Sequence, residues 1–194
     1  RMLIQESLGL NTLTGLVPLV KKIILGTAIV EGAGAVLYAT QFIPEFGVGY
    51  GIWAAVFNSI SAFCNAGMDI VKEDSFRSYV TNPVINFTTM ALIVLGGLGF
   101  IVWKDLWQSM KKLIKEKIPV KRIVQQLKFQ TKIVLSISTF LILFGTVLIF
   151  LFEYHNPATM GNLSLPGKVM ASLFQAVTTR TAGFETVAQG ALTD

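Results

Sequence analysis

Two short stretches of small and polar residues, far apart in the chain, each follow a hydrophobic segment and end in a glycine. They are Ser59–Gly67 and Gln175–Gly183. A dehydrated alkali cation needs several oxygen ligands at once, and backbone carbonyls supply them without a fixed negative charge that would hold the ion too long. Directing successive carbonyls inward requires backbone angles that favour glycine and other small residues. Both stretches therefore indicate cation binding by backbone oxygens.

The predicted ion-binding loops are Cys64, Asn65, Ala66, Gly67 and Met68 in the first stretch and Arg180, Thr181, Ala182, Gly183 and Phe184 in the second. Within them, the carbonyls of Asn65, Ala66, Gly67, Thr181, Ala182 and Gly183 are the expected K+ ligands. Thr181-Ala182-Gly183 is one small substitution away from the Thr-Val-Gly that opens the filter sequence of potassium channels. Potassium is therefore the cation that this pattern favours.

Polar residues ahead of each loop are expected to support it from the end of a short helix, where the helix dipole is negative and favours a cation. These residues are Ser59, Ser61, Gln175, Thr178 and Thr179. Two residues beyond each glycine stands a carboxylate, Asp69 or Glu185. At an outer mouth they would attract cations, with salt screening this effect over about 8 Å. The alternative is that both are ordinary loop or capping residues.

Arg180 and Glu31 are charged residues in otherwise apolar or small-residue surroundings. The Arg180 guanidinium would repel a cation if it pointed into the ion path. We expect it to point away and to hold the loop through hydrogen bonds to carbonyls or to a carboxylate, for which Glu31 is one candidate. A lone carboxylate inside a membrane span is costly, so Glu31 is expected to be neutral, paired or facing a polar cavity, in a supporting role.

The elements that carry these loops are membrane elements. Hydrophobic residues make up 53% of the chain and charged residues 14%, and the mean hydropathy is +0.63, which favours an all-α membrane protein. Windows over 23–43, 84–103 and 133–152 are long enough to span a bilayer. Windows over 51–64 and 166–179 hold about 14 residues, or about 21 Å of helix, against a hydrocarbon core of about 30 Å. They are predicted to be re-entrant pore helices.

Basic residues mark the cytoplasmic side. The connection 104–132 carries nine of them, Lys104, Lys111, Lys112, Lys115, Lys117, Lys121, Arg122, Lys128 and Lys132, against Asp105 and Glu116. The positive-inside rule makes this segment cytoplasmic and the acidic connection 44–82 external. The net charge of +5 thus belongs to the inner connection, where contact with anionic membrane lipid is the first interpretation and docking of a regulator the second. No soluble platform remains for nucleic acid.

This order predicts repeated units of helix, re-entrant pore helix with its loop, and helix. We assign 1–17 to a linker from a preceding repeat, 18–103 to a second repeat, 104–132 to a basic cytoplasmic linker and 133–194 to the start of a third repeat. The first loop falls at 64–68 and the second at 180–184. Two such loops account for half of a pore, so we expect the sequence to be part of a longer protein.

Four segments resemble the Trk/Ktr/HKT superfamily of potassium transporters, and in particular its Ktr-type membrane subunits. They are Phe57–Gly67, Phe174–Phe184, Arg1–Leu8 and Gly96–Phe100, and the string Thr-Thr-Arg-Thr-Ala-Gly-Phe is the most specific. The resemblance implies a multi-pass protein of the bacterial plasma membrane that takes up K+ through four repeats around one pore. It also implies a homodimer and a cytoplasmic ring of nucleotide-binding regulatory subunits. It implies no bound cofactor, and Na+ is either a coupling ion, an activating ion or neither.

Two other classes of function stay open at this point. A non-conducting membrane scaffold or assembly subunit would have no need of two matched loops. A membrane enzyme would need a nucleophile with a base or a cluster of metal ligands, and the single histidine, His155, lies in an outer loop without a partner pattern. The single cysteine, Cys64, excludes an internal disulfide within this sequence. A transporter without covalent chemistry is therefore the favoured class.

Overall fold

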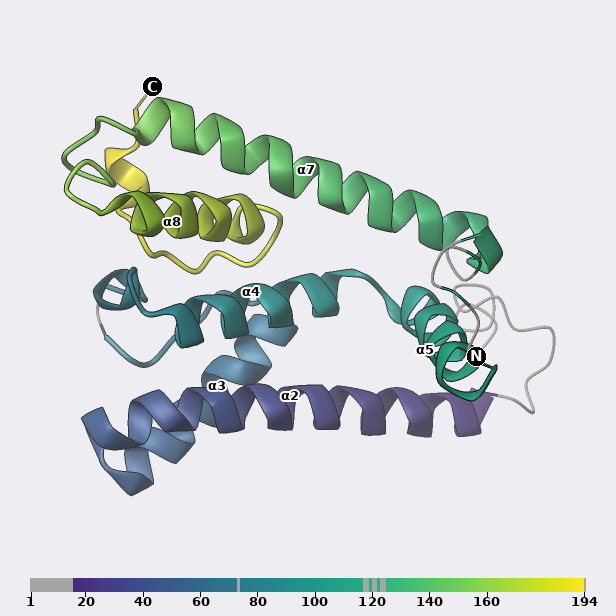
Figure 1. Cartoon of the computed structure of the whole chain (residues 1–194). Helices are drawn as coiled ribbons and strands as arrows, with labels where there is room; N and C mark the ends of the chain where they lie inside the picture. The colour runs from purple at the N-terminus through teal and green to yellow at the C-terminus, as the bar shows by residue number, and fades with distance from the viewer. Residues whose placement is uncertain (1–15, 73, 117–118, 120–121, 123–124, 194) are drawn as a thin grey trace. The chain divides into compact units, whose positions relative to one another are not determined.

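The structure is a computed structural model that describes residues 16–72, 74–116, 119, 122 and 125–193. Every regular element in these residues is helical, which confirms the predicted all-α membrane class (Figure 1). The elements are α2 (Leu16–Phe46), α3 (Val48–Phe63), η2 (Arg77–Tyr79), α4 (Pro83–Gly97), α5 (Phe100–Glu116), α7 (Phe129–Glu153), α8 (Leu165–Thr178) and η3 (Gln189–Ala191). The expected linker 1–17 lies almost wholly outside the described residues.

Contacts divide the chain into two units. The first takes in the chain up to Val30 and Gly99–Val134, and the second takes in Glu31–Leu98 and Leu135–Asp194. Both predicted ion-binding loops belong to the second unit, so the distances between them are defined. The first unit holds α5 and the beginnings of α2 and α7.

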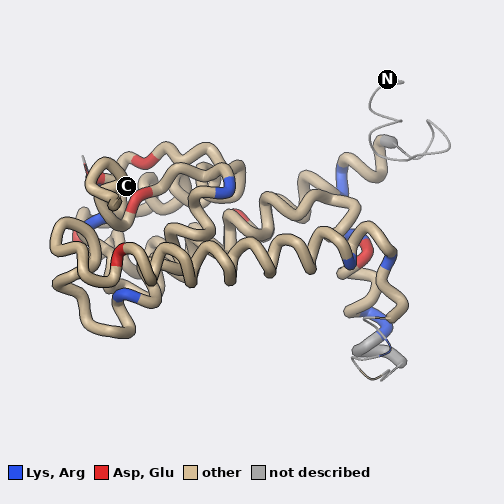
Figure 2. Tube along the Cα trace, turned by 90° about the horizontal axis from the view of Figure 1, so that it is seen from above, with Lys and Arg blue, Asp and Glu red and all other residues tan. Residues whose placement is uncertain are grey.

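Two helices, α2 and α7, are long and apolar enough to cross a membrane by themselves. Figure 2 shows the charged residues gathered mainly near helix ends and in the connections. The charges of α7 lie near its two ends, and in α2 Glu31 is the one charge between Lys22 and Glu45. Their apolar side chains face outward, as Val36 and Leu151 do with 66% and 65% of their surface exposed. Such exposure is expected where lipid, and not water, is the neighbour. In contrast, α3 and α8 have only 16 and 14 residues.

The predicted span 84–103 is not one continuous helix in the structure, and its crossing of the membrane stays a prediction. Helix α4 ends at Gly97, and α5 begins at Phe100 after a break at Leu98 and Gly99. Gly99 adopts a φ of 79°, in the left-handed region that glycine occupies without a steric penalty. Only α4 and α5 together, counted across this break, are long and apolar enough to cross a membrane. The basic connection expected to start at 104 therefore begins inside α5.

Glycines allow α3 to lie close to its neighbours. A turn at Gly47, with a φ of 78°, reverses the chain between α2 and α3. A Cβ added to Gly51 would come within 2.8 Å of the Ile43 backbone, and one added to Gly34 would come within 2.5 Å of the Ser59 hydroxyl. On its other side α3 packs against α4, where Gly96 faces the backbone carbonyl of Phe63. Helix α3 thus lies in close contact with both α2 and α4.

Asn82 and Pro83 set the start of α4. The Asn82 Oδ1 accepts hydrogen bonds from the backbone N–H groups of Val84 and Ile85, at 3.0 and 3.2 Å. Proline at the first helical position costs no hydrogen bond there, because that N–H would be unpaired in any case. These hydrogen bonds hold the end of the connection before α4 to the start of the helix.

Substitution of Gly96 tests this close packing. A Cβ at Gly96 would overlap the Phe63 carbonyl oxygen, whereas one at the neighbouring Gly97 meets nothing nearer than the Asn65 Nδ2 at 3.7 Å. We expect Gly96→Ala to destabilise the folded protein by about 1 to 3 kcal/mol, the usual cost of overpacking. Gly97→Ala is the matched control and should be close to neutral. The thermal midpoint of the detergent-solubilised intact protein measures both, and equal midpoints would contradict the packing.

Candidate ion-binding site

The first predicted loop, residues 64–68 and here called the first turn, leaves the end of α3 by a tight reversal. The backbone N–H of Asn65 donates to the Ala62 carbonyl at 3.2 Å, and that of Ala66 donates to the Ser61 carbonyl at 2.9 Å. Asn65 and Gly67 both have positive φ, 53° and 68°. Asparagine and glycine are the residues that adopt such angles most readily. The sequence Asn-Ala-Gly therefore dictates this conformation locally.

The second predicted loop, residues 180–184 and here called the second turn, leaves α8 in a similar way. The backbone N–H groups of Thr181, Ala182 and Gly183 converge on the Thr178 carbonyl, at 3.3, 2.9 and 3.4 Å. Gly183 has a φ of 86°. A single carbonyl at the end of the short helix thus organises the whole second turn.

A hydroxyl group clamps the far end of each turn. Ser61 Oγ donates to the Met68 carbonyl at 2.5 Å, and Thr178 Oγ1 donates to the Phe184 carbonyl at 2.9 Å. The clamped residue directly follows the glycine in both cases. Between hydroxyl and glycine, however, the first turn has one residue more than the second. The left-handed Asn65 accommodates this extra residue, so the two turns are related but not superimposable residue by residue.

The two turns meet at their glycines. A Cβ added to Gly67 would overlap the Ala182 carbonyl oxygen and lie 3.1 Å from the Gly183 Cα. In the other direction, a Cβ on Gly183 would lie 3.8 Å from the Gly67 Cα. Two backbones that are far apart in the sequence are therefore in direct contact. Of the predicted ligands, the structure brings Gly67, Ala182 and Gly183 together.

The remaining predicted supporting residues have different partners. Ser59, fully buried, donates to the backbone carbonyl of Glu31 at 2.6 Å and so joins α3 to α2. Thr179 donates to the Gln175 carbonyl of its own helix at 2.9 Å. The Gln175 amide is buried, and neither of its polar atoms has a partner among the described residues. Ser61 and Thr178 are therefore the two residues whose side chains hold the turns directly.

Arg180 is directed toward α7. Its Nη2 donates to the Ser138 Oγ at 3.1 Å, so the candidate partner Glu31 is not the one that the structure selects. Glu31 lies on α2, and what it gives to the site is its backbone oxygen, which Ser59 uses. Sequence reasoning did not identify Ser138, because a serine inside an apolar span carries no signal of its own.

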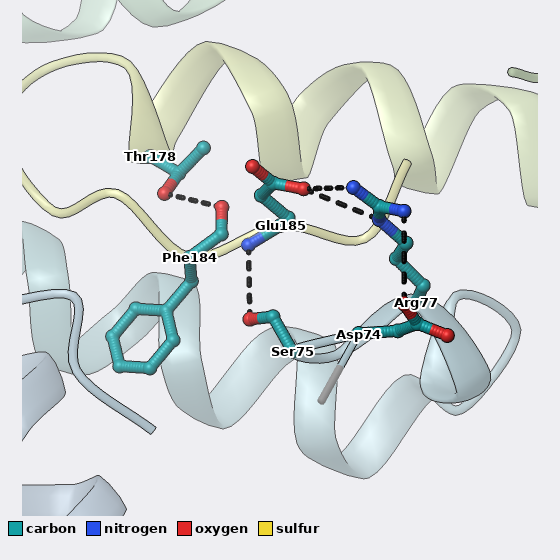
Figure 3. Close-up of polar contacts among 6 residues, drawn as sticks. All are labelled: Asp74, Ser75, Arg77, Thr178, Phe184 and Glu185. Atoms are coloured by element: carbon teal, nitrogen blue, oxygen red, sulfur yellow. Dashed lines mark hydrogen bonds and ion pairs between the residues drawn. The ribbon is translucent and has the colours of Figure 1, made fainter. Parts of the chain in front are cut away.

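Glu185 forms an ion pair with Arg77, a residue far away in the sequence. Its Oε2 accepts hydrogen bonds from Arg77 Nη2 at 2.6 Å and from Arg77 Nε at 3.2 Å (Figure 3). The hydrogen bond to Glu185 raises the pKa of Arg77, so this guanidinium stays charged. The Glu185 charge is thus paired with Arg77 in the structure, and its expected role at an outer mouth stays a prediction. Asp69 is half-buried, and its role at an outer mouth stays a prediction.

Arg77 is the functional residue that sequence reasoning missed. The outer connection 44–82 is acidic, and Lys72 and Arg77 are its only basic residues. Their isolation among carboxylates was the available signal, because an unlike charge in an acidic segment is a candidate for a specific ion pair.

Comparison with known proteins supports the assignment of these turns to a transport family. Residues 4–194 match the family model described as TrkH, cation transport protein. The chain is 40% identical over 185 residues to the Ktr system potassium uptake protein B of Vibrio alginolyticus, covering 95% of this chain and 38% of that protein. It is 34% identical over 192 residues to the protein of the same name from Bacillus subtilis, covering 99% and 40%.

A third relative, the potassium/sodium uptake protein NtpJ of Enterococcus hirae, is 33% identical over 187 residues, covering 96% of this chain and 38% of that protein. The chain thus spans about two fifths of the length of the curated relatives that it matches. The family match extends over almost every described residue, including both turns and the helices that carry them. The chain belongs to the TrkH family of cation transport proteins, which are integral membrane proteins.

Proposed function

We propose that the first and second turns are adjoining parts of one selectivity filter, through which the protein takes up K+ across the cell membrane. The observation that carries this proposal is the direct contact of Gly67 with Ala182 and Gly183. A filter needs carbonyl oxygens from separate segments around one ion, and this contact places two such segments together. Relatives named for potassium uptake support the choice of ion.

The hydroxyl clamps limit which carbonyls serve as ligands. Those of Met68 and Phe184 accept hydrogen bonds from Ser61 and Thr178, so they are turned toward the short helices. The carbonyls ahead of them, of Asn65, Ala66, Gly67, Thr181, Ala182 and Gly183, are the proposed ligands. Exposure alternates along the second turn, with Thr181 and Gly183 open and Ala182 and Phe184 buried. Such alternation leaves one side of the second turn free for an ion.

Transport without covalent chemistry is the class that the relatives named for potassium uptake support over the enzyme alternative. A role for Na+ is suggested by one of the relatives described above, NtpJ, which is named for potassium and sodium uptake. The homodimer and the cytoplasmic ring of nucleotide-binding subunits stay predictions from the resemblance, as does the division of the chain into repeats. The cytoplasmic segment offers part of a basic surface in α5, where Lys104, Lys111 and Lys112 are exposed.

Replacing the first-turn glycine tests the filter. In Gly67→Ser the new side chain would collide with the Ala182 carbonyl, and the φ of 68° would be strained. We expect K+ selectivity over Na+ to fall by about tenfold or more, equivalent to about 1.4 kcal/mol. The measurement is uptake of both ions by potassium-starved cells that express the intact transporter.

Gly49→Ser is the matched control, because a Cβ there meets nothing within 4 Å. Its uptake and selectivity should equal those of the wild type. If Gly67→Ser behaved like this control, the filter assignment would be wrong. If the wild-type protein itself moved no K+, the scaffold alternative would replace the proposal.

The clamp on the second turn gives an independent test. Thr178→Val keeps the size of the side chain and removes the donor to the buried Phe184 carbonyl. Leaving that acceptor unpaired costs about 1 to 3 kcal/mol, and we expect weaker K+ selectivity together with a lower thermal midpoint. Thr178→Ser retains the hydroxyl and should preserve selectivity. Equal selectivity in the two variants would show that the hydroxyl has no part in holding the filter.

A further inference from the structure

A segment of the outer connection before α4 grips the residue that ends the second turn. This segment, here called the outer strap, consists of Ser75, Phe76 and Arg77. Phe76 N–H donates to the Glu185 carbonyl at 2.9 Å, and Ser75 Oγ accepts from the Glu185 N–H at 3.3 Å. Arg77 holds the Glu185 carboxylate (Figure 3). The strap therefore engages both backbone polar groups and the side chain of Glu185.

An aromatic contact reinforces these polar bonds. The rings of Phe76 and Phe184 stack with centroids 5.1 Å apart and planes within 2° of parallel. Both side chains are fully buried. The Phe184 carbonyl is held from the opposite direction by Thr178. The two residues that follow Gly183 are thus fixed by α8 on one side and by the outer strap on the other.

The strap is itself anchored to the outer end of α2. Phe76 packs in an aromatic cluster with Phe42 and Tyr79, at centroid distances of 6.5 and 6.2 Å. Tyr79 donates to the Glu45 carboxylate at 2.6 Å, and Lys72 forms an ion pair with the same carboxylate at 2.6 Å. A continuous series of contacts therefore runs from α2 through the strap to the second turn. The strap cannot shift without disturbing a buried cluster.

We propose that the outer strap is a positioning element for the ion-binding carbonyls of the second turn, and that Arg77 acts on ion selectivity through Glu185. The proposal rests on the proposed function. Selectivity in such filters depends on how far the coordinating carbonyls can move or on the size of the cavity that they form. Gly183 gives the backbone freedom, and the strap removes that freedom two residues later. An ion pair that uses two N–H groups of one guanidinium adds geometric restraint to charge.

The exposure of the Arg77–Glu185 ion pair also explains why it restrains the second turn more than it changes the electrostatic potential at the ion. The Arg77 and Glu185 side chains keep 39% and 28% of their surface exposed, so solvent and salt screen their net effect on a passing ion. A local hydrogen-bonded contact is screened much less. We therefore expect selectivity to respond to the loss of contact geometry and not to the charge of the loop as a whole.

Single substitutions in the intact transporter test this role. Arg77→Gln and Glu185→Gln should each lower the ratio of Na+ KM to K+ KM by roughly three- to tenfold, the range expected for losing one charge-assisted contact. Arg77→Lys keeps the charge but loses the paired N–H geometry and should lie between. Asp74→Asn is the matched control. It removes the longer and more exposed ion pair of Arg77, at 3.9 Å with 74% of the Asp74 side chain exposed, and leaves the Arg77–Glu185 contact in place. Its ratio should stay at the wild-type value.

A double substitution separates positioning from general loss of stability. If Arg77 acts through Glu185, the double variant with Gln at both positions has the same ratio as the more affected single variant, because the interaction is already lost. Ratios that combine multiplicatively would overturn the proposal. It is also overturned if the single variants lower only the amount of folded protein while the KM ratio stays unchanged. In that case K+ selective uptake by the wild type, and with it the proposed function, would still stand.

Discussion

The contact between the Gly67 backbone and the Ala182 carbonyl is the constraint on which the rest of the site depends. There is no room for a Cβ at this point, so the two turns can approach only where one residue lacks a side chain. Around this contact, each further element restricts one turn from outside. The short helices supply hydroxyl clamps, and the outer strap supplies the last restraint on the second turn. Each of these holds one turn, and the glycine contact is what joins the two turns to each other.

The two turns have a similar conformation that is stabilised by different residues. Ser61 and Thr178 hold equivalent carbonyls, but the extra residue in the first turn is accommodated by the left-handed Asn65. The second turn has no such residue and is restrained instead by a neighbouring connection. Similar geometry is thus reached by a local conformation in the first turn and by a long-range contact in the second. An ion lying between them would have chemically unequal neighbours.

Much of this arrangement could be read from the sequence, because short-range rules determine it. The small residues of Asn65–Gly67 and Thr181–Gly183 specify turns wherever they occur, and helix length alone separates α3 from α2. The break at Gly99 was missed because apolar composition over 84–103 satisfied the length test, although glycine weakens a helix. Arg77 and Ser138 were missed for another reason. The isolated charge of Arg77 in an acidic connection indicated an ion pair but not its partner, and Ser138 gave no signal. Their partners, Glu185 and Arg180, lie far away in the sequence.

Helix α3 also has a consequence for the order in which the chain is assembled in the membrane. It carries buried polar side chains, Asn58, Ser59 and Ser61, which would be costly to expose to hydrocarbon. Ser59 finds its acceptor on α2, already synthesised, but the face toward α4 is covered only by a helix that follows in the chain. The polar side chains of α3 on this face are therefore fully covered only after α4, which comes later in the chain, has been synthesised and has packed against α3.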